Sequence, residues 1–461
     1  MTLGCTTALH LRRLALLHKY GVRAPRYTSY PTAVQFTPKV DTATYEAWLG
    51  ALPEHDPVSL YVHVPFCKRL CWFCGCNTRV VNRGESIGDY VALLCEEIAL
   101  VESRLPGKLR ADEVHLGGGT PNLLSIDDLR VLFGALRQVF RVSPGAEISA
   151  EMDPVSLTEP WVRAAVYHGL TRASLGVQDL SPDVQAAVNR NEPFEVVADA
   201  ARLLRGLGVA SLNLDLMYGL PRQRTADVLH TLDRVLTLRP ERLALFGYAH
   251  VPWMKPHQKL IDEAELPDLA ARLEQSEAAA ERLAREGYMA IGLDHFALPT
   301  DSLAVAASQG RLRRNFQGYV AETGVQTLLG FGVSAIGQLP QGIVQNQPTE
   351  IAWRKAVVEG RLATARGVAM TADDRLRGEV IERLMCEFGV DLAAVAARHD
   401  RDVDVFAAAG PVLDELQEDG LISRWGSLVT VSEVGRPFVR AVCAAFDAYL
   451  DRETVRHAVT V

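Results

Sequence analysis

Between residues 58 and 300 the sequence alternates short β-rich runs with stretches of helical length. Each run is rich in branched aliphatic residues and ends in turn-forming residues. The stretch that follows carries apolar side chains at three- and four-residue spacing. This alternation predicts consecutive βα units and a sheet of parallel strands. Strands are predicted at 59–64, 113–116, 147–151, 171–177, 211–217, 242–249 and 288–293, and helices at 87–104, 126–140, 194–207, 225–238 and 269–286.

A parallel sheet with this many units is expected to curve into a partial (β/α) barrel, so the predicted fold class is α/β. In such folds the reactive groups gather at the carboxyl ends of the strands. The residues at those positions are therefore the first candidates for a functional site: Cys67, Gly117, Gly118, Gly119, Thr120, Glu151, Gln178, Asp215 and Ala249.

The remaining sequence suggests three flanking parts. Residues 1–57 form an N-terminal extension that is expected to cover the site, and 58–300 form the barrel. Residues 301–369 connect the barrel to the end of the chain, and within them the uncharged, glycine-rich stretch 323–349 is expected to be a buried loop. Residues 370–461 show predicted helices at 371–388, 392–399 and 412–419, then a hairpin at 421–431 and a final helix from about Pro437, which is a winged-helix-like pattern.

Charge argues against a nucleic-acid partner, although winged helices often bind DNA. The whole chain carries −8, and residues 371–461 contain ten Arg, no Lys and seventeen acidic residues, a net charge of −7. A surface of that balance repels phosphate. The barrel is left nearly neutral, and the C-terminal part is expected to be an accessory or lid domain.

The N-terminus shows no secretory signal, because Arg12, Arg13 and Lys19 interrupt its only apolar stretch. The stretch 323–349 is long enough to span a membrane but is broken by several Gly, a Pro and several Gln residues. We therefore expect a cytoplasmic protein without a membrane segment. In that reducing compartment a cysteine cluster is expected to hold metal rather than form disulfides.

Four of the eight cysteines lie within ten residues, as Cys67, Cys71, Cys74 and Cys76. The first three form a C-x3-C-x2-C run, whose thiolates can converge on one iron-sulfur cluster with one iron left open. Two alternatives remain from the spacing alone. One is a closed zinc site completed by Cys76 or His63, and the other is an electron-transfer cluster ligated by all four cysteines.

This run resembles the signature of the radical S-adenosylmethionine (SAM) enzymes, in which an aromatic residue, here Trp72, follows the second cysteine. The stretch 61–77, including the extra Cys76, is similar to the narrower family of oxygen-independent coproporphyrinogen III oxidases (coproporphyrinogen dehydrogenases). The same similarity appears, in order along the chain, at 26–33, 117–121, 219–221, 292–297, 314–319 and 332–336. A radical SAM haem chaperone, which shares the cysteines and the winged-helix end, is the alternative.

The resemblance implies an oxidoreductase of porphyrin and haem biosynthesis. Cys67, Cys71 and Cys74 would hold a [4Fe-4S] cluster, and one or two molecules of SAM would bind at it. The 5′-deoxyadenosyl radical from SAM would start the oxidative decarboxylation of two propionates of coproporphyrinogen III to vinyl groups, giving protoporphyrinogen IX. It also implies an electron donor for the cluster, a final electron acceptor and a monomer. The cofactor carries the hard chemistry, and the protein positions it.

The resemblance also assigns roles to individual residues. Cys76 and Tyr61 are the candidate catalytic residues, although a free thiol as a small packing residue is the plainer reading of Cys76. Arg311, Arg313 and Arg314 could bind substrate carboxylates or simply be solvated. His295 is the only histidine singled out for test. The residues assigned to SAM are Tyr61, Phe73, Gly118, Gly119, Thr120, Glu151, Gln178, Arg190, Asp215, Ala249 and Ile336.

Overall fold

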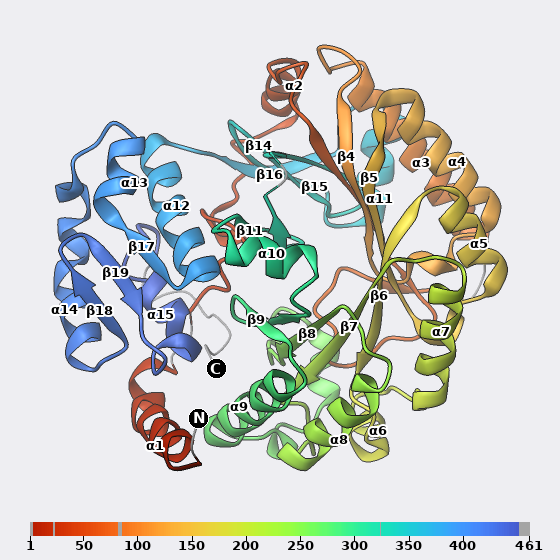
Figure 1. Cartoon of the computed structure of the whole chain (residues 1–461). Helices are drawn as coiled ribbons and strands as arrows, with labels where there is room; N and C mark the ends of the chain where they lie inside the picture. Colours follow the sequence, from red (N-terminus) through yellow and green to blue (C-terminus); the bar gives the residue numbers. More distant parts are fainter. Residues whose placement is uncertain (1–2, 22–23, 82–84, 323, 451–461) are drawn as a thin grey trace.

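A computed structural model describes residues 3–21, 24–81, 85–322 and 324–450. Its centre is a curved, open sheet of twelve strands in the order β16-β15-β14-β13-β1-β4-β5-β6-β7-β8-β10-β9 (Figure 1). The sheet does not close on itself, so the predicted partial barrel is confirmed. Helices cover its outer face, and the C-terminal part of the chain lies across its open side (Figure 1).

The six central strands are parallel, as the βα alternation predicts. They are β1 (Val58–Val64), β4 (Arg110–Gly118), β5 (Arg141–Met152), β6 (Leu170–Gln178), β7 (Ser211–Tyr218) and β8 (Arg242–Gly247). The five helices predicted in this region are also present, as α3 (Glu85–Glu102), α4 (Ile126–Val139), α7 (Phe194–Gly206), α8 (Thr225–Leu236) and α9 (Leu269–Arg285). The sequence reading missed the short helices α5 (Glu159–Tyr167) and α6 (Pro182–Ala187).

The flanks of the sheet differ from the expected parallel arrangement. At one edge β10 (His295–Ala297) and β9 (Met289–Ile291) are antiparallel. At the other edge the stretch 323–349, expected to be a loop, forms β13 (Thr327–Phe331), β14 (Ile336–Leu339) and β15 (Gly342–Asn346), and β16 (Thr364–Ala369) follows. β13 is parallel to β1, whereas β14 to β16 are antiparallel.

Glycine explains why this stretch looked like a loop. A Cβ on Gly330 would lie 2.6 Å from the carbonyl oxygen of Ile336, so the two strands can approach only because the side chain is absent. The loop prediction was wrong because glycine lowers strand propensity, while the long-range pairing with β1 outweighs that preference.

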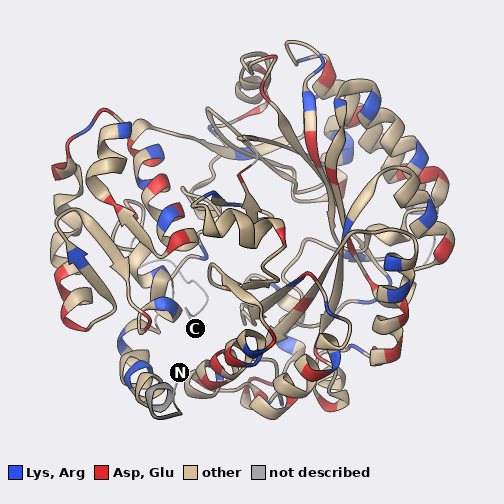
Figure 2. Cartoon of the chain, viewed as in Figure 1, with Lys and Arg blue, Asp and Glu red and all other residues tan. Residues whose placement is uncertain are grey.

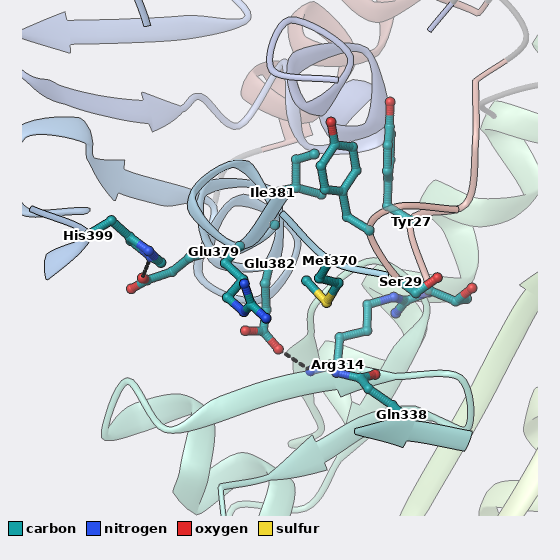
Figure 3. Close-up of a pocket in the computed structure, with 13 residues that line it drawn as sticks. Tyr27, Ser29, Arg314, Gln338, Met370, Glu379, Ile381, Glu382 and His399 are labelled. Carbon is teal, nitrogen blue, oxygen red and sulfur yellow. Dashed lines mark hydrogen bonds and ion pairs between the residues drawn. The ribbon is translucent and has the colours of Figure 1, made fainter. Parts of the chain in front are cut away.

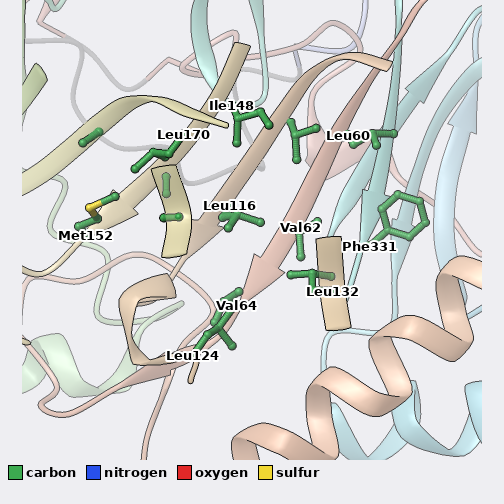
Figure 4. Close-up of a cluster of buried hydrophobic side chains, with 14 of the residues drawn as sticks. Leu60, Val62, Val64, Leu116, Leu124, Leu132, Ile148, Met152, Leu170 and Phe331 are labelled. Carbon is green, nitrogen blue, oxygen red and sulfur yellow. The ribbon is translucent and has the colours of Figure 1, made fainter. Parts of the chain in front are cut away.

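The hydrophobic core lies between the inner sheet and the helices. Aliphatic side chains of β1, β4, β5 and β6 pack against those of α4 and of β13 (Figure 4). The residues drawn in that figure include Leu60, Val62, Leu116, Leu132, Ile148, Leu170 and Phe331, each 4% exposed or less. This packed layer holds the strand ends, and hence the candidate site residues, in fixed positions.

The C-terminal part has the predicted winged-helix-like pattern. α12 (Ala372–Glu387), α13 (Leu392–Arg398) and α14 (Gly410–Glu418) precede the hairpin of β18 (Ile422–Trp425) and β19 (Leu428–Val431), which pairs with the unpredicted β17 (Gly389–Asp391). The final helix, α15 (Val439–Cys443), is short. A separate core, which also includes Leu17, Tyr20, Tyr27 and Tyr30, holds this unit together.

The N-terminal segment connects the barrel with the C-terminal unit. α1 (Leu3–Tyr20) lies against α9 and pairs with the C-terminal unit through Lys19 and Glu415, 2.7 Å apart. The chain then passes between the two parts to α2 (Thr42–Gly50). α10 (Ser302–Ser308) and the hairpin of β11 (Leu312–Asn315) and β12 (Gly318–Ala321) lie at the open side of the sheet (Figure 1).

Acidic and basic residues are interspersed along the outer helices, and the strands carry fewer of them (Figure 2). Among the described residues, no helix is long and apolar enough to cross a membrane. The sheet of parallel central strands covered by helices confirms the predicted α/β fold class.

Candidate active site

The predicted iron ligands lie on one loop at the carboxyl end of β1. Cys67 ends the short strand β2 (Phe66–Cys67), which pairs with β3 (Arg79–Val80). Cys67, Cys71 and Cys74 are half-buried free thiols, and Cys76 is exposed. In the described part of the chain, no three His, Cys, Asp or Glu side chains are grouped as the ligands of a single metal ion would be.

Two polar side chains contact the sulfurs. Thr120 Oγ1 lies 3.7 Å from Cys67 Sγ, and Arg190 Nη1 lies 3.6 Å from Cys71 Sγ. Burial raises the pKa of the Cys67 thiol to about 11, and burial also raises the pKa of Cys71 while the Arg190 charge opposes that shift. Soft thiols with a cation beside them are suitable donors for an iron-sulfur cluster.

Cys74 and Cys76 lie close together across Gly75. A side-chain hydrogen bond from Cys76 lowers the pKa of Cys74 to about 6. Cys74 is therefore the most readily ionised of the cysteines on this loop, and a thiolate is the form that binds metal. The contact brings the fourth cysteine of the loop beside the predicted ligands.

The segment after β8 holds the cysteine loop from the opposite side. His257 Nε2 donates to the carbonyl oxygen of Cys74 at 2.8 Å, and Lys255 Nζ donates to that of Cys76 at 3.0 Å. Gln258 Nε2 lies 3.0 Å from the carbonyl oxygen of Phe73 and 3.3 Å from that of Ala249. Gln258 thus links the backbones of Phe73 and Ala249. The sequence offered no signal for His257 or Gln258 beyond their position after a strand.

The glycine motif, residues Gly117 to Thr120, lies at the end of β4 and beside the cysteine loop. Gly118 has a φ of +107°, and a Cβ there would lie 2.3 Å from Cε1 of His63. A Cβ on Gly119 would lie 2.6 Å from the carbonyl oxygen of Phe66. Both positions therefore require glycine, the first for its backbone conformation and both for space.

Glu151, at the end of β5, is hydrogen-bonded to this motif. Its Oε2 accepts the backbone N–H of Gly118 at 2.8 Å, and its Oε1 lies 3.4 Å from His115 Nε2. Burial alone would raise the pKa of Glu151, but the His115 and Gly118 hydrogen bonds hold it below its ordinary value. Glu151 is thus a fixed negative charge at the mouth of the barrel.

Tyr61, on β1, joins a chain of hydrogen bonds that reaches the loop. The carbonyl oxygen of Asn77 can only accept, so His63 donates to it from Nε2, at 2.9 Å. Burial lowers the pKa of His63, so the ring is neutral and its Nδ1 accepts from the Tyr61 hydroxyl at 3.0 Å. Tyr61 also stacks on His115, with ring centroids 5.8 Å apart.

Gln178 and Arg190 meet near the end of β6. A Cβ on Gly176 would lie 3.1 Å from Gln178 Nε2 and 3.7 Å from Arg190 Nη2. Arg190 also forms an ion pair with Glu192, which has no exposed surface. The guanidinium that contacts Cys71 is thus held by a buried carboxylate that the sequence reading did not single out.

A cavity of about 300 Å³ lies inside the barrel below these groups. Glu151 and Asp215 are the predicted SAM-binding residues that line it. Asp215 accepts hydrogen bonds from Ser174 at 2.7 Å and Asn213 at 2.8 Å, and burial raises its pKa to about 6. His295, singled out from the sequence, also lines the cavity and pairs with Asp294 at 2.8 Å.

Ile336 lies near Tyr61 because of the strand order. Gly330 of β13 is paired with Tyr61 of β1, and the same glycine approaches Ile336. Ile336 does not line the barrel cavity. Ile336 lies on β14, which is separated from β1 by β13, and both strands belong to the stretch that was expected to be a loop.

The three candidate arginines of β11 and its preceding turn have different surroundings. Arg311 is exposed beside Gln309, and Arg313 pairs with Glu322 at 2.9 Å. Arg314 instead lines a second cavity of about 300 Å³ between the N-terminal segment and α12 (Figure 3). Its side chain runs toward the segment that carries Tyr27 and Ser29. Only Arg314 of the three therefore faces an interior space.

Comparison with known proteins gives matches to two family models and to full-length relatives. Residues 61–235 match the model of the Radical SAM superfamily, and residues 370–438 match that of the HemN C-terminal domain. The chain is 47% identical over 450 residues to the oxygen-independent coproporphyrinogen III oxidase of Bradyrhizobium diazoefficiens, covering 97% of this chain and 100% of that protein. It is 39% identical to that of Salmonella typhimurium, over 95% of each.

A solved structure agrees with these matches. The coproporphyrinogen III oxidase (HemN) of Escherichia coli, described as a radical SAM enzyme, is similar with a TM-score of 0.89 and 37% identity, covering 95% of this chain and 99% of that one. Superfamily membership implies a [4Fe-4S] cluster and SAM, which the half-buried thiols and the glycine motif suit. The chain therefore belongs to the oxygen-independent coproporphyrinogen III oxidase family of radical SAM enzymes.

Proposed function

We propose that this chain is an oxidoreductase that performs the anaerobic oxidative decarboxylation of two propionates of coproporphyrinogen III to vinyl groups, giving protoporphyrinogen IX. One observation carries the proposal. Three half-buried free thiols lie at the mouth of the barrel, where the glycine motif is hydrogen-bonded to Glu151. The agreement of relatives over almost the whole chain supports the substrate.

Cys67, Cys71 and Cys74 are proposed to hold the [4Fe-4S] cluster. Bound there, the cluster would supply the electron that cleaves SAM, so that the 5′-deoxyadenosyl radical can take a hydrogen atom from the β-carbon of a propionate. The chain's own residues orient the ligands: Arg190 balances the charge at Cys71, and His257 fixes the backbone at Cys74. Their contacts keep the loop in one geometry.

SAM is proposed to bind between the cysteine loop and the strand ends. The N–H groups of a side-chain-free turn allow close approach of a charged small ligand, and Glu151 and Asp215 offer carboxylates to a cationic one. We propose that one SAM binds at this site and that some of the same residues contact a second SAM molecule. The proposed contacts are Tyr61, Phe73, Gly118, Gly119, Thr120, Glu151, Gln178, Arg190, Asp215, Ala249 and Ile336.

Cys76 and Tyr61 are proposed to act in the reaction rather than as iron ligands. Cys76 is exposed, and its thiol is hydrogen-bonded to the side chain of Cys74, two residues away. The hydroxyl of Tyr61 is hydrogen-bonded to His63, which fixes the ring at the mouth of the barrel. A thiol in this place is suited to donate a hydrogen atom or quench a stray radical.

The other parts of the chain are proposed to enclose this site. Residues 1–57 and 370–461 would cover the open side of the barrel of 58–300, with 301–369 connecting them, and exclude water and oxygen. An external electron donor would supply the first electron, and a final electron acceptor would take the last. We further propose that the enzyme works as a monomer in the cytoplasm.

One anaerobic assay tests the proposal. Purified, iron-reconstituted protein is incubated with SAM, a reductant and coproporphyrinogen III, and the product is analysed by mass. Two successive losses of CO2 with two hydrogens are expected, together with 5′-deoxyadenosine. Tight haem binding without turnover would instead favour a haem chaperone and would refute the oxidase assignment.

A further inference from the structure

The cysteine loop, residues 67–81, packs against the segment 248–261 that follows β8. Three side chains of the second segment are hydrogen-bonded to the backbone of the first, among them Lys255, whose Nζ lies 3.0 Å from the carbonyl oxygen of Cys76. The structure describes every residue of both segments, and none of them lines either of the two cavities described above. Together the two segments therefore form a surface at the barrel mouth that lies outside both cavities.

These two segments carry basic residues and no acidic ones. Three of the seven lysines of the chain are among them, although the whole chain has a net charge of −8. Lys68 and Lys259 are exposed, and neither forms an ion pair with any described residue. We call the outer surface of 67–81 and 248–261 the basic face. Its lysines and arginines are Lys68, Arg69, Arg79, Lys255 and Lys259.

Acidic residues that pair with the basic face or border it in sequence offset only part of its charge. Glu350 forms an ion pair with Arg79 at 2.8 Å. Asp262 and Glu263 follow the second segment directly, and the side chain of Glu263 is 72% exposed. Three carboxylates set against five basic residues leave a charge of +2 on this part of the surface. The basic face thus has the opposite sign to the chain as a whole.

Large apolar side chains are exposed on the second segment of the basic face. Met254 is 65% exposed, Leu260 is 60% exposed and Trp253 is 41% exposed. Lys255 and Lys259 lie between them in the sequence, so that apolar and cationic groups are interspersed. Single exposed apolar side chains are ordinary, but three of them grouped beside positive charge are typical of a surface that binds another protein.

The basic face lies directly over the proposed cluster ligands. Lys68 follows Cys67 in the sequence, and His257 of the second segment donates to the carbonyl oxygen of Cys74 at 2.8 Å. The opposite side of the cysteine loop is where SAM and the porphyrinogen are proposed to bind. A protein that delivers an electron to a cluster on this loop therefore has to approach from the basic face.

We propose that the basic face docks a small acidic redox protein, which supplies the electron for the cluster. This inference rests on the proposed function, which requires an external electron donor but does not say where it binds. The reduced partner would lose one electron and the cluster would gain it, with no bond formed or broken. Opposite charges speed such encounters, and the interfaces of electron-transfer partners are small and transient.

The test uses reconstituted holoenzyme and an acidic bacterial flavodoxin, in its oxidised form, as the probe. Lys68→Glu, Lys259→Glu and the double variant are titrated with flavodoxin by calorimetry at low and high salt. The matched control is Lys108→Glu, which is also exposed but lies just before β4, at the amino end of the strands. The double variant is expected to bind flavodoxin about tenfold or more weakly at low salt and to depend less on salt, whereas the control stays within about twofold.

Further measurements separate the possible outcomes. Reduction of the cluster by reduced flavodoxin should slow by a similar factor in the double variant, while its reduction by dithionite, its iron content and its SAM affinity stay within about twofold. Unchanged flavodoxin affinity in the double variant would overturn the proposal. An equal loss of iron or SAM binding would also overturn it, because the two lysines would then serve the fold.

A nucleic acid is the other macromolecule that a basic surface could bind. Tighter binding of a DNA duplex than of flavodoxin, lost in the same double variant, would overturn the proposal in favour of that partner. The titrations need no turnover of substrate. An oxidase assay driven by dithionite that gives no product would therefore refute the proposed function separately from the docking proposal.

Discussion

The backbone N–H of Gly118 donates to Oε2 of Glu151 at 2.8 Å, which joins the end of β4 to the end of β5. This bond places a partly buried negative charge behind the glycine motif, beside the cysteine loop. It also gives the motif a fixed shape before any ligand binds, which reduces the entropy lost on binding.

The charge of Glu151 can be tested by Glu151→Gln. The amide keeps the shape but loses the charge, so the dissociation constant for SAM is expected to rise about tenfold, or about 1.4 kcal/mol. Iron content should stay unchanged, because Glu151 contacts none of the cysteines in the described structure. Equilibrium SAM binding to the reconstituted protein checks this, with the exposed Glu159→Gln as control. Normal SAM affinity in the variant would contradict the assignment.

The requirement for glycine at position 118 can be tested by stability. Gly118→Ala would force a side chain into a positive-φ conformation and against His63, at a cost of about 1–3 kcal/mol or more. Gly134→Ala is the control, because Gly134 lies inside helix α4 with no atom within 4 Å of the added Cβ. That control should gain about 0.5–1 kcal/mol. Urea unfolding of both variants measures the difference, and equal midpoints would show that the turn tolerates a side chain.

The cysteines can be separated by iron content after anaerobic reconstitution. Cys67→Ser is expected to lose the cluster and the formation of 5′-deoxyadenosine, whereas Cys76→Ser should keep about four irons per chain. The reason is that Cys76 is exposed and hydrogen-bonded to Cys74, whereas the three predicted ligands are half-buried. Loss of cluster absorbance in Cys76→Ser would identify it as a ligand.

Asp215 should make stability depend on pH. Burial raises its folded pKa to about 6 from 3.8, so the native state holds a proton that the unfolded chain has released between those values. Stability is therefore lost as the pH rises from about 4 through 6. Asp215→Asn removes this ionisation cost and should be more stable than the parent at pH 8, by about 1–3 kcal/mol, with the difference shrinking toward pH 4.

Urea unfolding at several pH values measures this effect. Asp199→Asn is the control, because its carboxylate is 69% exposed on α7 and its stability difference should not change over this range. A pH-independent difference for Asp215→Asn would mean that the hydrogen bonds of Ser174 and Asn213, rather than ionisation, decide the effect.

The sequence alone was enough to predict the central strands, the outer helices and the cysteine loop. These features repeat at fixed short spacing, two residues in a strand and three to four in a helix, and the C-x3-C-x2-C run is equally local. The motif at 117–120 and Glu151 could be placed at strand ends for the same reason. Their meeting follows from parallel strands sharing one edge.

The tertiary structure decided what depends on contacts between distant segments. β13 pairs with β1 across more than 260 residues of sequence, His257 reaches the backbone of Cys74, and Arg26 reaches the backbone of Gly247. No local spacing encodes these contacts, because each depends on the packing of whole elements around the core. The sequence therefore indicated the chemistry of the cysteine loop, whereas only the folded chain brought His257 and Gln258 to the backbone of that loop.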